Sequence, residues 1–109
     1  MKKVFSVLTI AMVLSLSAFA QKKTETFAVS GNCGMCKNKI ETAAKDAGAT
    51  KATWDDEKKQ ITVEFKAKKT SLDAIQKKIA EVGYDNAKYK AEASVYDKLH
   101  GCCKYERSM

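Results

Sequence analysis

The chain has 109 residues, of which 45% are hydrophobic and 30% charged, and it contains no proline. This length and composition predict one globular domain and argue against a two-domain enzyme, a disordered chain and a membrane bundle. The 20 lysine and arginine residues outnumber the 13 acidic residues, which gives a formal charge of +7. Four cysteines and one histidine are the obvious soft-metal or redox groups.

Residues 1–20 have the pattern of a cleavable secretory signal peptide. Two lysines follow Met1, an apolar run extends from Val4 to Leu16, and Ala18 and Ala20 provide the small residues that a signal peptidase requires. The apolar run is short for a transmembrane helix, so we expect no membrane span after cleavage, with an uncleaved anchor as the alternative. Cleavage lowers the formal charge to +5 and leaves all four cysteines in an exported protein, periplasmic or secreted, where thiols tend to pair.

The first half of the exported chain predicts a strand, a helix and two more strands. Residues 24–30 alternate as a strand does, and from Cys36 the apolar residues recur at helical spacing until Gly48, which ends the helix. Strands are predicted at 49–55 and 61–65, joined by a polar turn.

The second half repeats this plan. Thr70 and Asp73 form a plausible capping pair before an amphipathic helix that ends at Gly83, and a weaker strand is predicted at 84–91. The order strand, helix, strand, strand, helix, strand predicts an α+β fold of the ferredoxin-like βαββαβ type, in which two helices cover one face of an antiparallel sheet. The expected core residues are Phe27, Val29, Ile40, Ala44, Trp54, Ile61, Val63, Phe65, Leu72, Ile75, Ile79 and Val82.

Residues 92–109 lie outside the repeated pattern and form a short cysteine-containing tail. Within it, Val95, Tyr96 and Leu99 predict a short helical face to which Cys103 can belong. The sequence therefore divides into a signal peptide at 1–20, a domain at 21–91 and the tail at 92–109.

The residues best suited to chemistry are Cys33 and Cys36, in the predicted loop between the first strand and the first helix. The amides and the dipole at a helix N-terminus stabilise thiolates, and thiolates bind soft cations such as Cu(I), Zn(II) or Hg(II). Gly31 and Gly34 let the loop bend tightly around an ion held between the two sulfurs. A Cys-x-x-Cys pair taken alone serves metal sites, redox sites and plain disulfides alike.

The segment Val29–Lys37 with the following Ile40-Glu41, and the pair Gly83-Tyr84 after the second helix, resemble the heavy-metal-associated domain family. That family includes copper chaperones, the N-terminal modules of copper-transporting ATPases and a periplasmic mercury-binding protein. The resemblance spans residues 24–91 and implies a metal bound by Cys33 and Cys36, with the Tyr84 ring packed beside the metal loop.

One departure from the family concerns methionine. The family usually has Gly-Met-x-Cys where this chain has Ser30-Gly31-Asn32-Cys33, and Met35 lies between the cysteines instead. We expect Met35 to fill the core beneath the loop rather than to bind the metal through its thioether.

The tail cysteines leave three interpretations open. Cys102 and Cys103, with His100, can fold back and add ligands to the Cys33/Cys36 site, the cysteines can form disulfides, or they can form a separate site facing a partner. In the loop before the second helix, Lys69 can offset the negative charge of a metal held by two thiolates, if that loop lies close to the site.

These patterns predict an exported, non-enzymatic protein that binds a soft ion and passes it on by thiolate exchange. Cu(I) is the expected ion, with Hg(II), Zn(II) and Cd(II) as alternatives, because thiolates accept all four. The expected partner is a metal-transporting or metal-accepting protein, and the protein itself is expected to be a monomer. The lysines are scattered among acidic residues, which argues against a nucleic-acid partner.

Two other functions compete with metal transfer. A thiol-disulfide oxidoreductase can use the same Cys33/Cys36 pair, although enzymes of the thioredoxin type have a cis-proline facing the active pair and this chain has no proline. The other is a structural adaptor in which disulfides only stabilise a small secreted domain.

Overall fold

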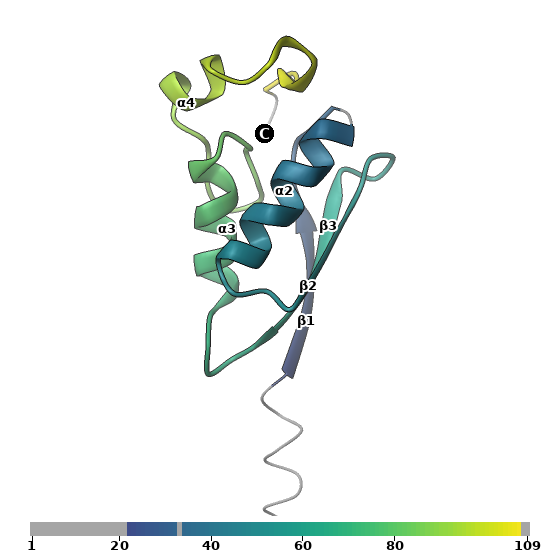
Figure 1. Cartoon of the computed structure of the whole chain (residues 1–109), viewed down its shortest axis with the longest axis vertical. Helices are drawn as coiled ribbons and strands as arrows, with labels where there is room; N and C mark the ends of the chain where they lie inside the picture. The colour runs from purple at the N-terminus through teal and green to yellow at the C-terminus, as the bar shows by residue number, and fades with distance from the viewer. Residues whose placement is uncertain (1–21, 33, 108–109) are drawn as a thin grey trace, which may run out of the picture.

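A three-stranded antiparallel sheet forms one layer of the molecule (Figure 1). It consists of β1 (Lys22–Ala28), β2 (Lys51–Asp55) and β3 (Gln60–Lys66), in the order β1-β3-β2. This computed structural model describes residues 22–32 and 34–107, so the expected signal peptide and Cys33 lie outside the described part.

The apolar residues of the strands alternate and bury one face of the sheet. Ile61, in the central strand β3, lies opposite both Phe27 of β1 and Trp54 of β2. All three side chains are buried, whereas their neighbours along each strand are more exposed and, apart from Ala28, polar. The period-2 pattern of the sequence therefore identifies the buried face correctly.

Two helices cover that face of the sheet: α2 (Gly34–Asp46) and α3 (Leu72–Glu81). Ser71 caps the start of α3: its hydroxyl accepts a hydrogen bond from the Ala74 amide at 3.1 Å. The prediction that Thr70 caps this helix is wrong, because the Thr70 hydroxyl instead donates to the Ala47 carbonyl at 2.6 Å. All the predicted core residues are buried except two, Leu72 and Val82, which pack against the core but stay partly exposed.

The predicted fourth strand at 84–91 is reduced to a single bridge between Val29 and Asn86. The Asn86 side chain accepts hydrogen bonds from the amides of Lys88 and Tyr89, and this turn bends the chain away from β1. Asparagine side chains compete with strand pairing by such local bonds, which explains why the alternation here does not produce a full strand. The α+β, ferredoxin-like arrangement is otherwise confirmed.

The tail begins with a short helix, α4 (Ala93–Asp97), and includes one 3-10 turn, η1 (Gly101–Cys103). Leu99 and Cys103 are buried and Tyr96 packs partly against the core, but Leu99 and Cys103 lie beyond the end of α4, so the predicted helical face of the tail is confirmed only in part. Among the described residues, no helix has the length and apolar character needed to cross a bilayer.

Candidate metal site

Cys36 lies in the first turn of α2, and its side chain is completely buried. No acidic residue occupies this first turn, so no carboxylate offsets the positive end of the helix dipole. A thiolate that binds a soft cation in that position faces the positive end of the helix dipole. The other predicted ligand, Cys33, lies outside the described residues, one position before the helix begins.

The loop before the helix rests on the indole of Trp54. The indole nitrogen donates a hydrogen bond to the Val29 carbonyl at 3.0 Å, and the ring lies directly beneath Gly31. A Cβ atom at Gly31 would lie 2.8 Å from the ring, so only glycine fits without rearrangement. Trp54 therefore provides the packing beneath the loop.

Tyr84 follows α3 and is completely buried beside Cys36, as the family resemblance implies. Its hydroxyl forms no hydrogen bond of normal geometry within the described chain, although it lies against the thiols of Cys36 and Cys103. Burial raises the pKa of Tyr84 far above its ordinary value, and the two neighbouring thiols raise it further. The Tyr84 hydroxyl therefore keeps its proton and has no acceptor in good hydrogen-bond geometry among the described residues.

Of the two tail cysteines, Cys103 is completely buried and Cys102 is exposed, with their sulfur atoms 3.9 Å apart. Burial raises the pKa of the Cys103 thiol to about 12; Cys36 adds to this shift, and the Tyr84 hydroxyl opposes it. His100 is exposed at the start of η1, and its carbonyl accepts the Cys103 amide at 2.8 Å. The tail thus brings one sulfur to the predicted site and leaves the other facing solvent.

Residues 98–107, which we call the C-terminal loop, are held in place by Tyr105. Its hydroxyl donates to the Gly83 carbonyl at 2.8 Å and accepts the Asp85 amide at the same distance. The Tyr105 ring stacks on Tyr84 with a centroid separation of 5.9 Å. Leu99 packs over Gly83, whose φ of 112° and close neighbour leave no room for a side chain.

The C-terminal loop also contacts the metal loop directly. The side-chain amide of Asn32 donates a hydrogen bond to the Lys104 carbonyl at 3.1 Å. Figure 1 shows the yellow C-terminal loop crossing the end of the fold at which α2 begins. Lys104, which follows Cys103, is therefore bonded to Asn32, the residue before Cys33.

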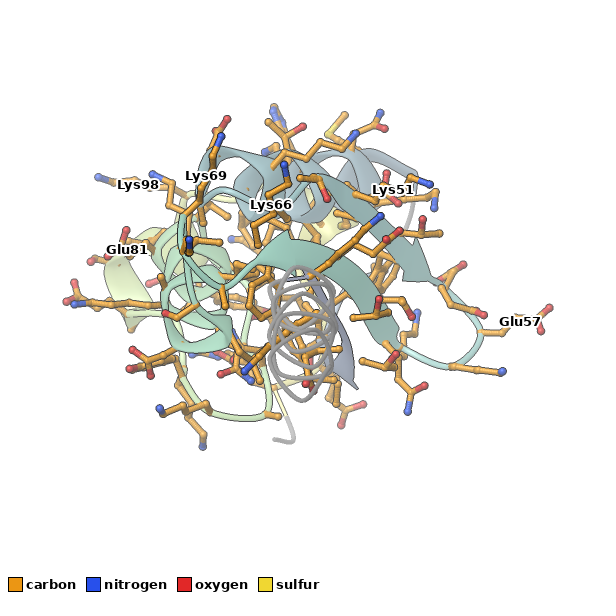
Figure 2. The ribbon with its side chains drawn as sticks, turned by 90° about the horizontal axis from the view of Figure 1, so that it is seen from below. Lys51, Glu57, Lys66, Lys69, Glu81 and Lys98 are labelled. Atoms are coloured by element: carbon orange, nitrogen blue, oxygen red, sulfur yellow. The ribbon has the colours of Figure 1, made fainter. Side chains whose placement is uncertain are left out.

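Two predictions about residues around the site are wrong. Met35, the second residue of α2, is 44% exposed, so it does not fill the core; the Trp54 ring packs beneath the loop instead. Lys69 lies at the opposite end of α2 from Cys36, because its neighbour Thr70 packs against Gly48. Helix α2 is about 20 Å long, which is too far for Lys69 to offset charge at the site. Figure 2, viewed from that end, shows Lys69 near Lys66.

Lys37, which follows Cys36, is already engaged. Its ammonium group donates to Glu41 at 2.7 Å and to the Trp54 carbonyl at 2.9 Å. Glu41 in turn accepts the Trp54 amide at 2.9 Å. These bonds fasten the start of α2 to β2 and so position Cys36.

Residues 22–32 and 34–107 contain no cluster of three His, Cys, Asp or Glu side chains able to hold a metal ion. Within that range, the thiols of Cys36 and Cys103 lie against each other, and the other predicted loop ligand, Cys33, lies outside it. Sequence reasoning missed the residues that place Cys103, namely Asn32, Asp85, Tyr105 and Arg107. For Tyr105 and Arg107 the sequence offers only a concentration of polar and aromatic residues after Cys103, without periodicity, and for Asn32 and Asp85 it offers no such signal.

Comparison with known proteins points to one family. Residues 26–85 match the model of the heavy-metal-associated domain. Among solved structures, CopZ metallochaperone is 30% identical with a TM-score of 0.57, and the alignment covers 60% of this chain and 100% of that protein. A copper form of a CopA variant from Bacillus subtilis is 29% identical with a TM-score of 0.52, covering 67% of this chain and 95% of that one.

The N-terminal domain of the zinc(II) ATPase ZiaA, in its apo form, is also 29% identical with a TM-score of 0.52. That alignment covers 80% of this chain and 84% of the ZiaA domain. No match was found among curated protein sequences. The similar structures thus include one titled for copper and one titled for zinc on the same fold.

Proposed function

Because this chain belongs to the heavy-metal-associated domain family, we propose that it is an exported metal carrier that binds Cu(I) through Cys33 and Cys36. The observation that carries the proposal is the placement of Cys36: buried, in the first turn of α2, and beside the Tyr84 hydroxyl. An ion bound there replaces a thiol proton, and the resulting thiolate is stabilised by the helix dipole and by a hydrogen-bond donor.

The choice of Cu(I) over Hg(II), Zn(II) and Cd(II) is supported by the chemistry of the donors. The described groups nearest to Cys36 that can contact an ion are a second thiol and a tyrosine hydroxyl, and His100 is exposed. An all-sulfur donor set favours soft ions, whereas Zn(II) is frequently completed by imidazole or carboxylate. A similar structure titled as a copper form supports the same choice.

The proposed role is transfer of the ion to an accepting protein, without catalysis of a covalent reaction. An incoming thiolate bonds to the ion as one of the carrier's sulfurs leaves, so the ion is never released to water. Similarity to a metallochaperone and to a domain of a metal-transporting ATPase supports acceptors of that kind. The signal-peptide pattern of residues 1–20 supports a periplasmic or secreted location for a monomeric carrier.

An anaerobic titration of the reduced mature protein with Cu(I), against a competing chelator, tests this proposal. We expect one ion per chain, with binding lost in Cys33→Ser and in Cys36→Ser. Cys102→Ser is the matched control, because the same substitution is made at an exposed cysteine. Failure of the unmodified protein to take Cu(I) from the chelator would contradict the proposal, and turnover of a model disulfide would favour the oxidoreductase.

A further inference from the structure

The buried tail cysteine, Cys103, lies outside residues 26–85, which match the family model. Its side chain is completely buried and lies against Cys36 and Tyr84. Free cysteine behaves as a small hydrophobic residue in a core, but here its thiol lies against a second thiol, that of Cys36, and against the Tyr84 hydroxyl. The question is what the three groups do together.

From this arrangement we infer that Cys103 is a third sulfur ligand for the ion held by Cys33 and Cys36, carried to the site by the C-terminal loop. The inference rests on the proposed function and deepens it. The family resemblance implies two cysteine ligands in the metal loop, and this inference adds a third sulfur ligand from the C-terminal loop. It also gives the two adjacent tail cysteines different roles, because Cys103 lies against Cys36 whereas Cys102 is exposed.

The Tyr84 hydroxyl provides independent support. It is buried and makes no hydrogen bond of normal geometry within the described residues, yet it lies against both Cys36 and Cys103. An unpartnered buried donor is costly, and a thiolate is a stronger acceptor than a thiol. Binding of an ion converts both neighbouring thiols to thiolates, and the hydroxyl then has the acceptor that it lacks in the metal-free protein.

Hydrogen bonds between the C-terminal loop and the rest of the domain hold Cys103 in position. Asn32 bonds the loop on the side of the metal loop, and Tyr105 bonds it to the chain on either side of Tyr84. Arg107 then closes on the buried carboxylate of Asp85. Ligands of a metal site need this kind of support from neighbouring residues to keep their geometry.

Binding and release balance as exchanges at sulfur. Each thiol that bonds to the ion releases one proton to solvent, so three protons leave when Cys33, Cys36 and Cys103 all bind. On transfer, the bond from the ion to Cys103 breaks as a bond to an acceptor thiol forms, and the proton of that thiol passes to Cys103. The C-terminal loop thus adds a third bond that must be exchanged before the ion leaves.

X-ray absorption at the copper edge of the Cu(I)-loaded protein tests the inference, because it counts the sulfur atoms around the ion. We expect three sulfurs in the unmodified protein and in Cys102→Ser, and two sulfurs with a shorter mean bond in Cys103→Ser. In chelator competition, Cys103→Ser should weaken Cu(I) binding about 10-fold or more, whereas Cys102→Ser should change it little.

Two sulfurs in the unmodified protein, or three in Cys103→Ser, would overturn the inference and leave the proposed function standing. A protein that takes no Cu(I) from the chelator would overturn both. The sulfur count of Cys102→Ser decides the matter even if the buried substitution at Cys103 impairs folding, since the sulfurs left in that variant are those of Cys33, Cys36 and Cys103 and of the methionines, and two sulfurs there would overturn the inference.

Discussion

Arg107 binds Asp85 through two hydrogen bonds, from Nε to Oδ2 at 3.0 Å and from Nη2 to Oδ1 at 2.8 Å. The Asp85 side chain is 1% exposed, and its Oδ1 also accepts the Ala91 amide at 2.8 Å. Burial alone would raise the pKa of Asp85, but the bonds from Arg107 and Ala91 outweigh it and hold the pKa below its usual range. The pair therefore fastens the C-terminal loop to the segment after α3.

Arg107→Met should destabilise the protein, because it leaves the Asp85 carboxylate buried without its counter-charge. The expected loss in the free energy of unfolding is roughly 2 kcal/mol, below the value for a fully buried pair because Arg107 is partly exposed. Urea unfolding followed by tryptophan fluorescence measures it. Glu106→Gln is the control at an exposed neighbour and should leave the midpoint unchanged, and an equal loss in both variants would contradict the role of the pair.

The same pair predicts how stability depends on pH. Because the pKa of Asp85 is lowered in the folded protein, its contribution is complete above the pKa of the unfolded chain and is lost as the pH falls through the folded value. Melting temperatures should therefore fall more steeply below about pH 4 in the unmodified protein than in Arg107→Met. Parallel acid limbs in the two proteins would argue against Asp85 as the source.

Tyr84→Phe should act in opposite directions on the metal-free and metal-loaded protein. The substitution removes a buried hydroxyl that has no good partner, so the metal-free protein should be as stable or more stable by up to about 1 kcal/mol. In the loaded protein the hydroxyl donates to a thiolate, so Cu(I) affinity should fall. Thermal melting and chelator competition give the two readings, and a variant that is destabilised without metal would contradict this account.

Gly31→Ala should destabilise the protein, whereas Gly34→Ala should not. A Cβ at Gly31 would lie 2.8 Å from the Trp54 ring and 3.1 Å from Ile40, which forces the packing beneath the loop apart at a cost of about 1–3 kcal/mol. A Cβ at Gly34 meets nothing within 4 Å, and alanine favours the helix that begins there. Chemical unfolding of the metal-free variants gives the comparison, and equal effects would be inconsistent with the contact to Trp54.

Apolar periodicity in the sequence was enough to predict α2, α3 and the three strands, together with most of the core. Each of these patterns is short in range, since a helix or strand shows its buried face through residues only a few positions apart. The position of Cys36 at a helix start and of Tyr84 after Gly83 follow from the same local patterns. The fourth strand failed for a local reason that periodicity does not record, namely the hydrogen bonds of the Asn86 side chain.

The tertiary structure alone decided how distant segments meet. Adjacent in the chain, Cys102 and Cys103 differ in burial because Tyr105 and Leu99 dock the C-terminal loop in one orientation. Lys69 and Met35 were candidates because of their positions in the sequence. Lys69 is excluded because it lies at the end of α2 opposite Cys36, and Met35 does not fill the core because the Trp54 ring packs beneath the loop. Such relationships depend on packing between residues far apart in sequence, where side-chain shape and paired polar groups decide the contact and local patterns carry no information.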